Sequence, residues 1–117
     1  MQHIQSPEEL EDAIQAPIAL LYKHSETCPI SAMALREVAH LAEAYPELPV
    51  YVVDVHAQRG LARGIAARFD IRHESPQAIL LRDGAPVWHA SHFRVTARAL
   101  EAQLGERAER AAMSDER

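Results

Sequence analysis

Two short apolar runs with one amphipathic stretch between them constrain the fold of this chain more than any other feature. The run 17–23 is almost continuously apolar, and the run 50–55 is rich in β-branched and aromatic residues. Such runs are typical of strands that are covered on both faces of a sheet. Because a helix that joins two such strands makes a right-handed crossover, we predict a β-α-β unit with parallel strands.

The stretch between the two runs has the spacing of a helix. Its apolar residues recur at intervals of four, four, three and four positions, at Ile30, Ala34, Val38, Leu41 and Tyr45. These side chains share one helical stripe. We predict a helix over 29–45, which begins beside the single cysteine of the sequence, Cys28.

A short helix is predicted before the first strand. Ser6 can cap free N–H groups, Pro7 stands where a helix needs no donor, and Glu9 is placed to complete a capping box. We expect this helix to run to about Ile14.

The second half of the chain predicts a helix and a β-hairpin. Apolar residues recur every four positions over 61–69, and 78–81 is a short apolar run. Asp83 and Gly84 are residues that a tight hairpin turn prefers. The strand that starts at Val87 is therefore expected to return antiparallel to 78–81.

A closing helix completes one domain. Thr96 can cap it, and the flanking Val95 and Leu100 are spaced for a hydrophobic staple. We predict an α/β fold with a mixed four-stranded sheet and helices on both faces. Because 117 residues are too few to divide into two domains, we expect a single domain over 1–112 and a frayed tail over 113–117.

Charge and cysteine content disfavour several classes of function. With 12 basic and 17 acidic residues the net charge is −5, which leaves no basic surplus for nucleic acid or an anionic membrane. The chain starts without a secretory signal pattern, and no apolar run has the length of a membrane span. One cysteine cannot form an internal disulfide, which favours a reducing compartment. We expect a cytoplasmic protein that binds neither nucleic acid nor membrane.

Cys28 is the first candidate for chemistry, because it lies between a strand and a helix start. A thiol there faces free N–H groups and the positive end of the helix dipole, which favour the thiolate. Pro29 fixes the helix start, and Ser31 can donate its hydroxyl hydrogen to the sulfur. Lys23 and His24 add positive charge nearby. Position alone leaves open that Cys28 is only a small buried apolar residue.

Pro76, just before the strand at 78–81, is the second candidate feature. A proline that precedes a strand is by default a trans residue. If the Ser75–Pro76 bond were cis, the Ser75 backbone groups would turn outward and could pair with a docked peptide or thiol.

These features together resemble the thioredoxin-like superfamily over nearly the whole chain. The segment 69–84 is similar to that superfamily's run into its cis-proline, the next strand and the hairpin. Cys28-Pro29-Ile30-Ser31 stands where thioredoxins have Cys-x-x-Cys, and the second cysteine is absent. More narrowly, the run Lys-His-Ser-Glu-Thr-Cys-Pro-Ile-Ser over 23–31 resembles the monothiol bacilliredoxins.

The resemblance to bacilliredoxins implies an enzyme of the stress response that removes bacillithiol from S-thiolated client proteins. Cys28 would attack the mixed disulfide, and bacillithiol, another low-molecular-weight thiol or a reductase would then reset it from outside the chain. No tightly bound cofactor is implied. By the same analogy Pro76 is cis, the Ser75 backbone contacts the adduct, and Lys23 attracts the carboxylates of the ligand. The motif residues around the sulfur would be Thr27, Pro29, Ile30 and Ser31.

Two other functions stay open. A non-catalytic adaptor would recruit a client with the Pro76 edge and use no thiol chemistry. An iron–sulfur carrier would share a cluster between two subunits, but Pro29 and Ile30 depart from the Cys-Gly-Phe-Ser motif of such relatives. The histidines form no compact Cys/His set with the spacing of a metal site, so we expect no bound metal.

Overall fold

The computed structural model of the protein describes residues 1–105. The predicted domain end at 112 and the predicted tail over 113–117 lie outside the described residues. The elements in chain order are β1 Gln2–His3, α1 Pro7–Ala13, β2 Ile18–His24, α2 Pro29–Ala44, β3 Val50–Asp54, α3 Arg59–Phe69, β4 Gln77–Arg82, β5 Ala85–Ser91 and the 3-10 helix η1 His92–Arg94. Residues 97–105 are helical as well. Among the described helices, none is both long enough and apolar enough to cross a bilayer.

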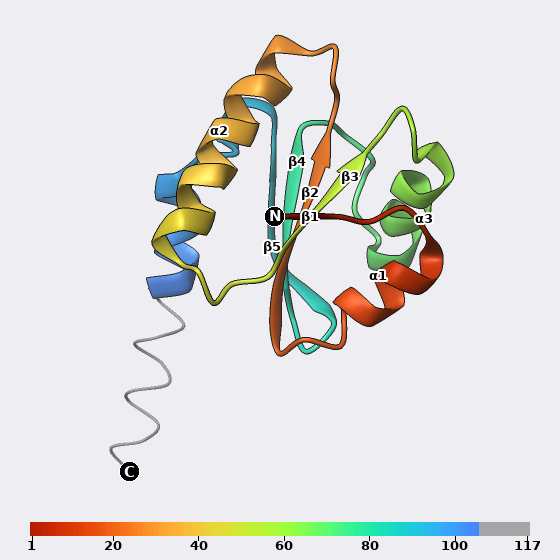
Figure 1. The fold of residues 1–117 in the computed structure, drawn as a ribbon, viewed down its shortest axis with the longest axis horizontal. Coiled ribbons are helices and arrows are strands. Elements are labelled where there is room, and N and C mark those ends of the chain that lie inside the picture. Colours follow the sequence, from red (N-terminus) through yellow and green to blue (C-terminus); the bar gives the residue numbers. More distant parts are fainter. Residues whose placement is uncertain (106–117) are drawn as a thin grey trace.

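The strands form one mixed sheet with the order β1-β3-β2-β4-β5. β1, β3 and β2 are parallel, whereas β4 is antiparallel to both β2 and β5. Helices α1 and α3 cover one face of the sheet, and α2 and the helix 97–105 cover the other (Figure 1). The predicted α/β fold with a mixed sheet and helices on both faces is confirmed.

The predicted number of four strands is wrong, because β1 adds a fifth. This strand is only two residues long, and both of its side chains are exposed, so it has no apolar run to signal it. It joins the sheet through its backbone, which pairs with Tyr51 and Val52, and the Ile4 N–H extends the pairing to the Val52 carbonyl at 3.0 Å.

The sheet separates two apolar cores. Leu20 and Tyr22 of β2 belong to the core beneath α2, and Leu21 belongs to the core beneath α1 and α3. This alternation follows from the period of two along a strand. Both neighbours of β2 are strands, and its residues from Ala19 to His24 are all buried, as the continuous apolar run predicts.

Local signals in the sequence place the predicted caps and turn correctly. The Ser6 hydroxyl oxygen accepts from the Glu9 N–H at 3.2 Å, and the Thr96 hydroxyl oxygen accepts from the Ala99 N–H at 3.1 Å. The hairpin turn between β4 and β5 has positive φ at Asp83 (51°) and at Gly84 (79°). Two consecutive left-handed residues are what a type I′ turn requires.

Candidate active site

Cys28 lies at the start of α2, after the short loop that follows β2. It occupies the N-cap position with an extended backbone (φ −104°, ψ 119°), and Pro29 is the first helical residue. The Cys28 N–H donates to the Ser25 carbonyl at 3.3 Å, which closes the loop into a turn. The thiol is half-buried. A side chain at the N-cap faces the N–H groups of the first helical turn, which have no partner within the helix.

Ser31 is the buried neighbour of this cysteine in the first turn of α2. Its side chain is fully buried, and its Oγ accepts a hydrogen bond from the Ser25 N–H at 3.2 Å. That bond uses a lone pair of the oxygen, so the hydroxyl hydrogen stays available for the sulfur of Cys28. The serine of the Cys-x-x-Ser motif can therefore act as a donor.

The pKa of the Cys28 thiol is lowered by its surroundings. The backbone N–H of Ser31 contributes most, the N–H of Ile30 and the Ser31 hydroxyl add to it, and partial burial opposes them. Donors that face the sulfur stabilise its negative charge. The Cys28 side chain makes no single capping hydrogen bond to the helix N–H groups. The lowering of its pKa is therefore shared among several donors.

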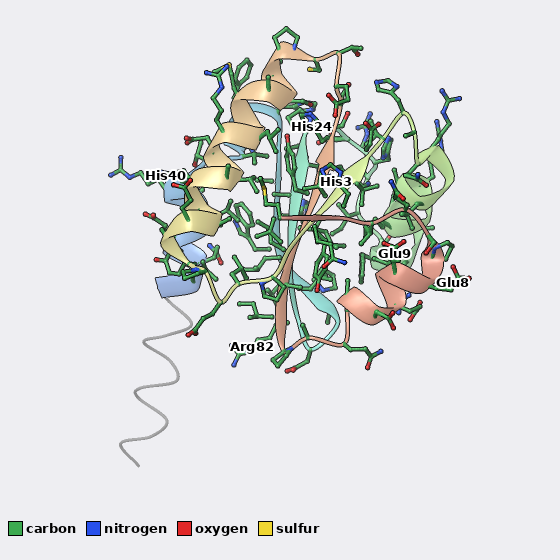
Figure 2. All side chains as sticks on the ribbon, viewed as in Figure 1. His3, Glu8, Glu9, His24, His40 and Arg82 are labelled. Atoms are coloured by element: carbon green, nitrogen blue, oxygen red, sulfur yellow. The ribbon has the colours of Figure 1, made fainter. Side chains whose placement is uncertain are left out.

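Two polar side chains of β2 lie beneath Ser31 in the core on the α2 side. The Tyr22 hydroxyl donates to the Ser31 carbonyl at 2.8 Å and lies 3.2 Å from His24 Nδ1. His24 is at the end of β2 from which the chain runs on to α2 (Figure 2). Burial raises the pKa of Tyr22, so its hydroxyl stays protonated.

Lys23 lies on the opposite face of the sheet and is fully buried. Its Nζ is 3.1 Å from His73 Nδ1, and Gln77 of β4 pairs with it across the strands. Burial lowers the pKa of Lys23 to about 8. The pKa of His73 is lowered by burial and by the charges of Lys23 and Arg63. The Lys23 ammonium is therefore not exposed at the surface of the site and contacts His73 instead.

The Ser75–Pro76 peptide bond is cis, which is the isomer that the resemblance implies. Pro76 is buried and Ser75 is half-buried, directly before β4. Because β2 and β4 are antiparallel with Lys23 opposite Gln77, this bond and the loop to α2 lie at the same end of the sheet. The N–H of His92 in η1 donates to the Pro76 carbonyl at 2.9 Å.

A groove of about 280 Å³ lies between α2 and η1 at this end of the sheet. Met33 and Phe93 line it and are 53% and 68% exposed, which gives the groove an apolar rim. Of the motif residues, Ile30 lines the groove and is half-buried, whereas Thr27 and Pro29 are exposed to solvent.

Sequence reasoning missed the polar contacts that support the site. Ser25 Oγ is 2.9 Å from His56 Nε2, a contact between residues 31 positions apart. Lys23 and His73 are 50 positions apart, so no local pattern signals their contact. A signal did exist for Tyr22: it stands two positions before His24, which follows directly at the end of the predicted strand, and this spacing places both side chains on one face.

The described residues contain no group of three or more His, Cys, Asp or Glu side chains placed to hold a metal ion. The surroundings of Cys28 are instead hydrogen-bond donors. This arrangement supports the chemistry of a nucleophilic thiol.

The fold and the thiol at the start of α2 are those of the thioredoxin-like class of thiol oxidoreductases. The sequence has a single cysteine, so it is a monothiol protein. The chain matches the family of the monothiol bacilliredoxin BrxC over residues 2–100. It therefore belongs to the monothiol bacilliredoxin BrxC family.

The chain is also similar to solved structures with a thioredoxin fold. The chain is 30% identical to a protein with a thioredoxin fold that is described as a candidate oxidoreductase, with a TM-score of 0.82 and coverage of 86% of this chain and 90% of that one. A variant thioredoxin from Halobacterium salinarum NRC-1 is 23% identical, with a TM-score of 0.72 and coverages of 87% and 85%. Mitochondrial thioredoxin 3 from Saccharomyces cerevisiae is 17% identical, with a TM-score of 0.75 and coverages of 91% and 94%. The last two support the fold alone.

Proposed function

We propose that this protein removes bacillithiol from S-bacillithiolated client proteins through a mixed disulfide on Cys28. The observation that carries the proposal is one half-buried thiol at the start of α2, with the donors of Ser31 around it and no second cysteine in the sequence. Membership of a family of monothiol bacilliredoxins supports bacillithiol as the small thiol.

In the first step the Cys28 thiolate attacks the bacillithiol sulfur of the client's mixed disulfide. A new disulfide joins Cys28 to bacillithiol, and the client cysteine leaves with the electron pair of the broken bond and takes a proton from solvent. The lowered pKa of Cys28 raises the fraction of thiolate available for this attack.

The second step needs a thiol from outside the chain, because the sequence holds no other cysteine. Free bacillithiol, or the thiol of a reductase, attacks the bacillithiol sulfur of the adduct. The attacking thiol loses its proton to solvent and forms a new disulfide with bacillithiol, and Cys28 leaves as the thiolate with the electron pair of the broken bond. The low-molecular-weight thiol is thus a co-substrate, and the cycle needs no tightly bound cofactor.

We assign contact with the bound disulfide to residues at this end of the sheet: Thr27, Pro29, Ile30, Ser31, Ser75 and Pro76. The backbone of Ser75 is the part of this set that can pair with an extended segment of the client. Lys23 contributes at longer range, from beneath the segment that carries His73. The partners are S-thiolated client proteins, and we propose the cytoplasm as the compartment where they meet.

Intact-mass analysis after incubation with oxidised bacillithiol tests the proposal. The wild-type protein should gain the mass of one bacillithiol, and free thiol should reverse the gain. Cys28→Ser should show no gain, because it removes the only thiol of the sequence. Release of bacillithiol from a thiolated client should likewise depend on Cys28.

Two results would count against this function. A wild-type protein that forms no adduct lacks the first step. A Cys28→Ser variant that binds clients and replaces the wild-type protein in cells would favour the adaptor function instead.

A further inference from the structure

We propose that Tyr22 and His24 are positioning residues that hold the donors of Ser31 against the sulfur of Cys28. This inference rests on the proposed role of Cys28 as the reacting thiol. Two buried side chains of β2 thus help to stabilise the reactive thiolate form of Cys28.

The direction of the hydrogen bonds follows from the hydrogens that are present. A tyrosine hydroxyl has one hydrogen, and that of Tyr22 goes to the Ser31 carbonyl at 2.8 Å. Tyr22 can therefore meet His24 Nδ1, 3.2 Å away, only as an acceptor. The Nδ1 of His24 must carry a hydrogen, and the bonds run in series from His24 to Tyr22 to Ser31.

Burial makes the loss of any one of these hydrogen bonds costly. Tyr22 and Ser31 are fully buried, and His24 is 6% exposed. Water therefore cannot replace a lost partner, and hydrogen bonds in a low-dielectric interior strengthen one another along a chain. The other ring nitrogen of His24, Nε2, lies 3.8 Å from a carboxylate oxygen of the exposed Glu26, which is beyond hydrogen-bond distance.

Ser31 accepts hydrogen bonds at its carbonyl and at its Oγ, and its two hydrogens, on the backbone nitrogen and on the hydroxyl, are left for the sulfur. Its carbonyl accepts from Tyr22, and its Oγ accepts from the Ser25 N–H at 3.2 Å. Its N–H and its hydroxyl hydrogen both contribute to the field on Cys28. The N–H groups of the first helical turn lack partners within the helix. The ties of Ser31 to β2 and to Ser25 therefore add to the helix's own backbone bonds in fixing the position of this turn.

Tyr22→Phe tests the inference, because it removes the hydroxyl and keeps the ring in the core. We expect the thiolate of Cys28, followed by its ultraviolet absorbance against pH, to form at a higher pH than in the wild-type protein. The rate of reaction with iodoacetamide near neutral pH should fall about two- to tenfold, the effect of one hydrogen bond on the thiolate. Tyr51→Phe is the matched control, since Tyr51 packs on the other face of the sheet and should leave both readouts unchanged.

Variants of His24 test the first bond of the series. His24→Leu removes the donor and should shift the thiolate titration in the same direction. His24→Asn keeps an N–H near the position of Nδ1 and should shift it less. The double variant of Tyr22→Phe with His24→Leu should differ little from Tyr22→Phe alone, because both changes act through the carbonyl of Ser31.

A folded Tyr22→Phe protein, judged by circular dichroism, with the thiolate titration of the wild type would overturn the inference. If Tyr22→Phe does not fold, the difference between His24→Leu and His24→Asn decides the question, and equal titrations overturn it. Neither readout uses bacillithiol. A shifted titration in a protein that accepts no bacillithiol therefore supports the positioning role while the proposed function fails.

Discussion

Position 31 decides what the single thiol of this protein can do. A second cysteine there would close a disulfide with Cys28, whereas Ser31 supplies hydrogen-bond donors and no sulfur. The same position thus stabilises the thiolate and prevents internal resolution. A mixed disulfide on Cys28 can therefore be reduced only by a thiol from another molecule.

Ser31→Cys should convert the carrier of a mixed disulfide into a dithiol protein. The new thiol would lie in the first turn of α2, three positions after the N-cap residue Cys28. We expect it to attack the Cys28 adduct and release bacillithiol without an added thiol. Intact mass would then show a protein that has lost two hydrogens. Ser31→Ala is the control, and an adduct that persists equally in both variants contradicts this expectation.

Lys23 is the only lysine of the sequence, and it is fully buried. Its pKa falls to about 8 from the ordinary value of 10.5 because burial disfavours the charged form. The folded protein therefore binds fewer protons than the unfolded chain between these two pH values. The free energy of unfolding therefore rises as the pH increases from about 8 to about 10.5. Below about pH 8 Lys23 is charged in the folded protein, and folding carries the full cost of burying that charge.

Lys23→Met should stabilise the protein near neutral pH. Removing the buried charge is expected to raise the free energy of unfolding by about 1–3 kcal/mol at about pH 7, less whatever the lost contact with His73 contributed. The gain should shrink as the pH rises from about 8 to about 10.5. Urea unfolding at both ends of this range measures it. The exposed Arg82→Met serves as control, and a gain independent of pH would show that the charge of Lys23 is not its source.

At the scale of elements, the hairpin between β4 and β5 depends on backbone conformation. Gly84 has a φ of 79°, and a Cβ at this position would lie 3.3 Å from the Ile14 carbonyl oxygen. The turn is therefore packed against the end of α1, and a side chain at position 84 would be strained in backbone conformation and tightly packed against the Ile14 carbonyl. Gly64, within α3, has nothing within 4 Å of an added Cβ.

The same substitution at these two glycines should change stability in opposite directions. Gly84→Ala is expected to lower the free energy of unfolding by about 1–2 kcal/mol, because L-residues pay for the left-handed conformation. Gly64→Ala should raise it by about 0.5–1 kcal/mol through helix propensity. Thermal unfolding of both variants measures the difference. A stabilised Gly84→Ala protein would contradict the packing of this turn.

At the scale of the whole molecule, the site is assembled at one end of the sheet. The loop after β2, the segment before β4 and the helix η1 meet there, next to the start of α2. Polar side chains continue beneath it into both cores, with Tyr22 and His24 on the α2 face and Lys23 on the other. Away from this end the central strands β2, β3 and β4 are largely apolar, and they hold it in place.

Much of this organisation follows from local pattern. The order of the elements from α1 onward, the caps at Ser6 and Thr96 and the hairpin turn all depend on residues within a few positions of one another. Periodicity and turn chemistry act over that distance, so the amino-acid sequence by itself determined them. It also determined that one thiol begins a helix, followed by Pro29, with serine at the third helical position.

What surrounds that thiol was decided only by the tertiary structure. Pairing of β1 needs no side-chain signal, because it uses backbone groups. The bond from Tyr22 to the Ser31 carbonyl and the contact of Lys23 with His73 depend on how strands, helix and loop come together in space. Such contacts join residues far apart in the chain, and their energy comes from burial and geometry that no local pattern encodes.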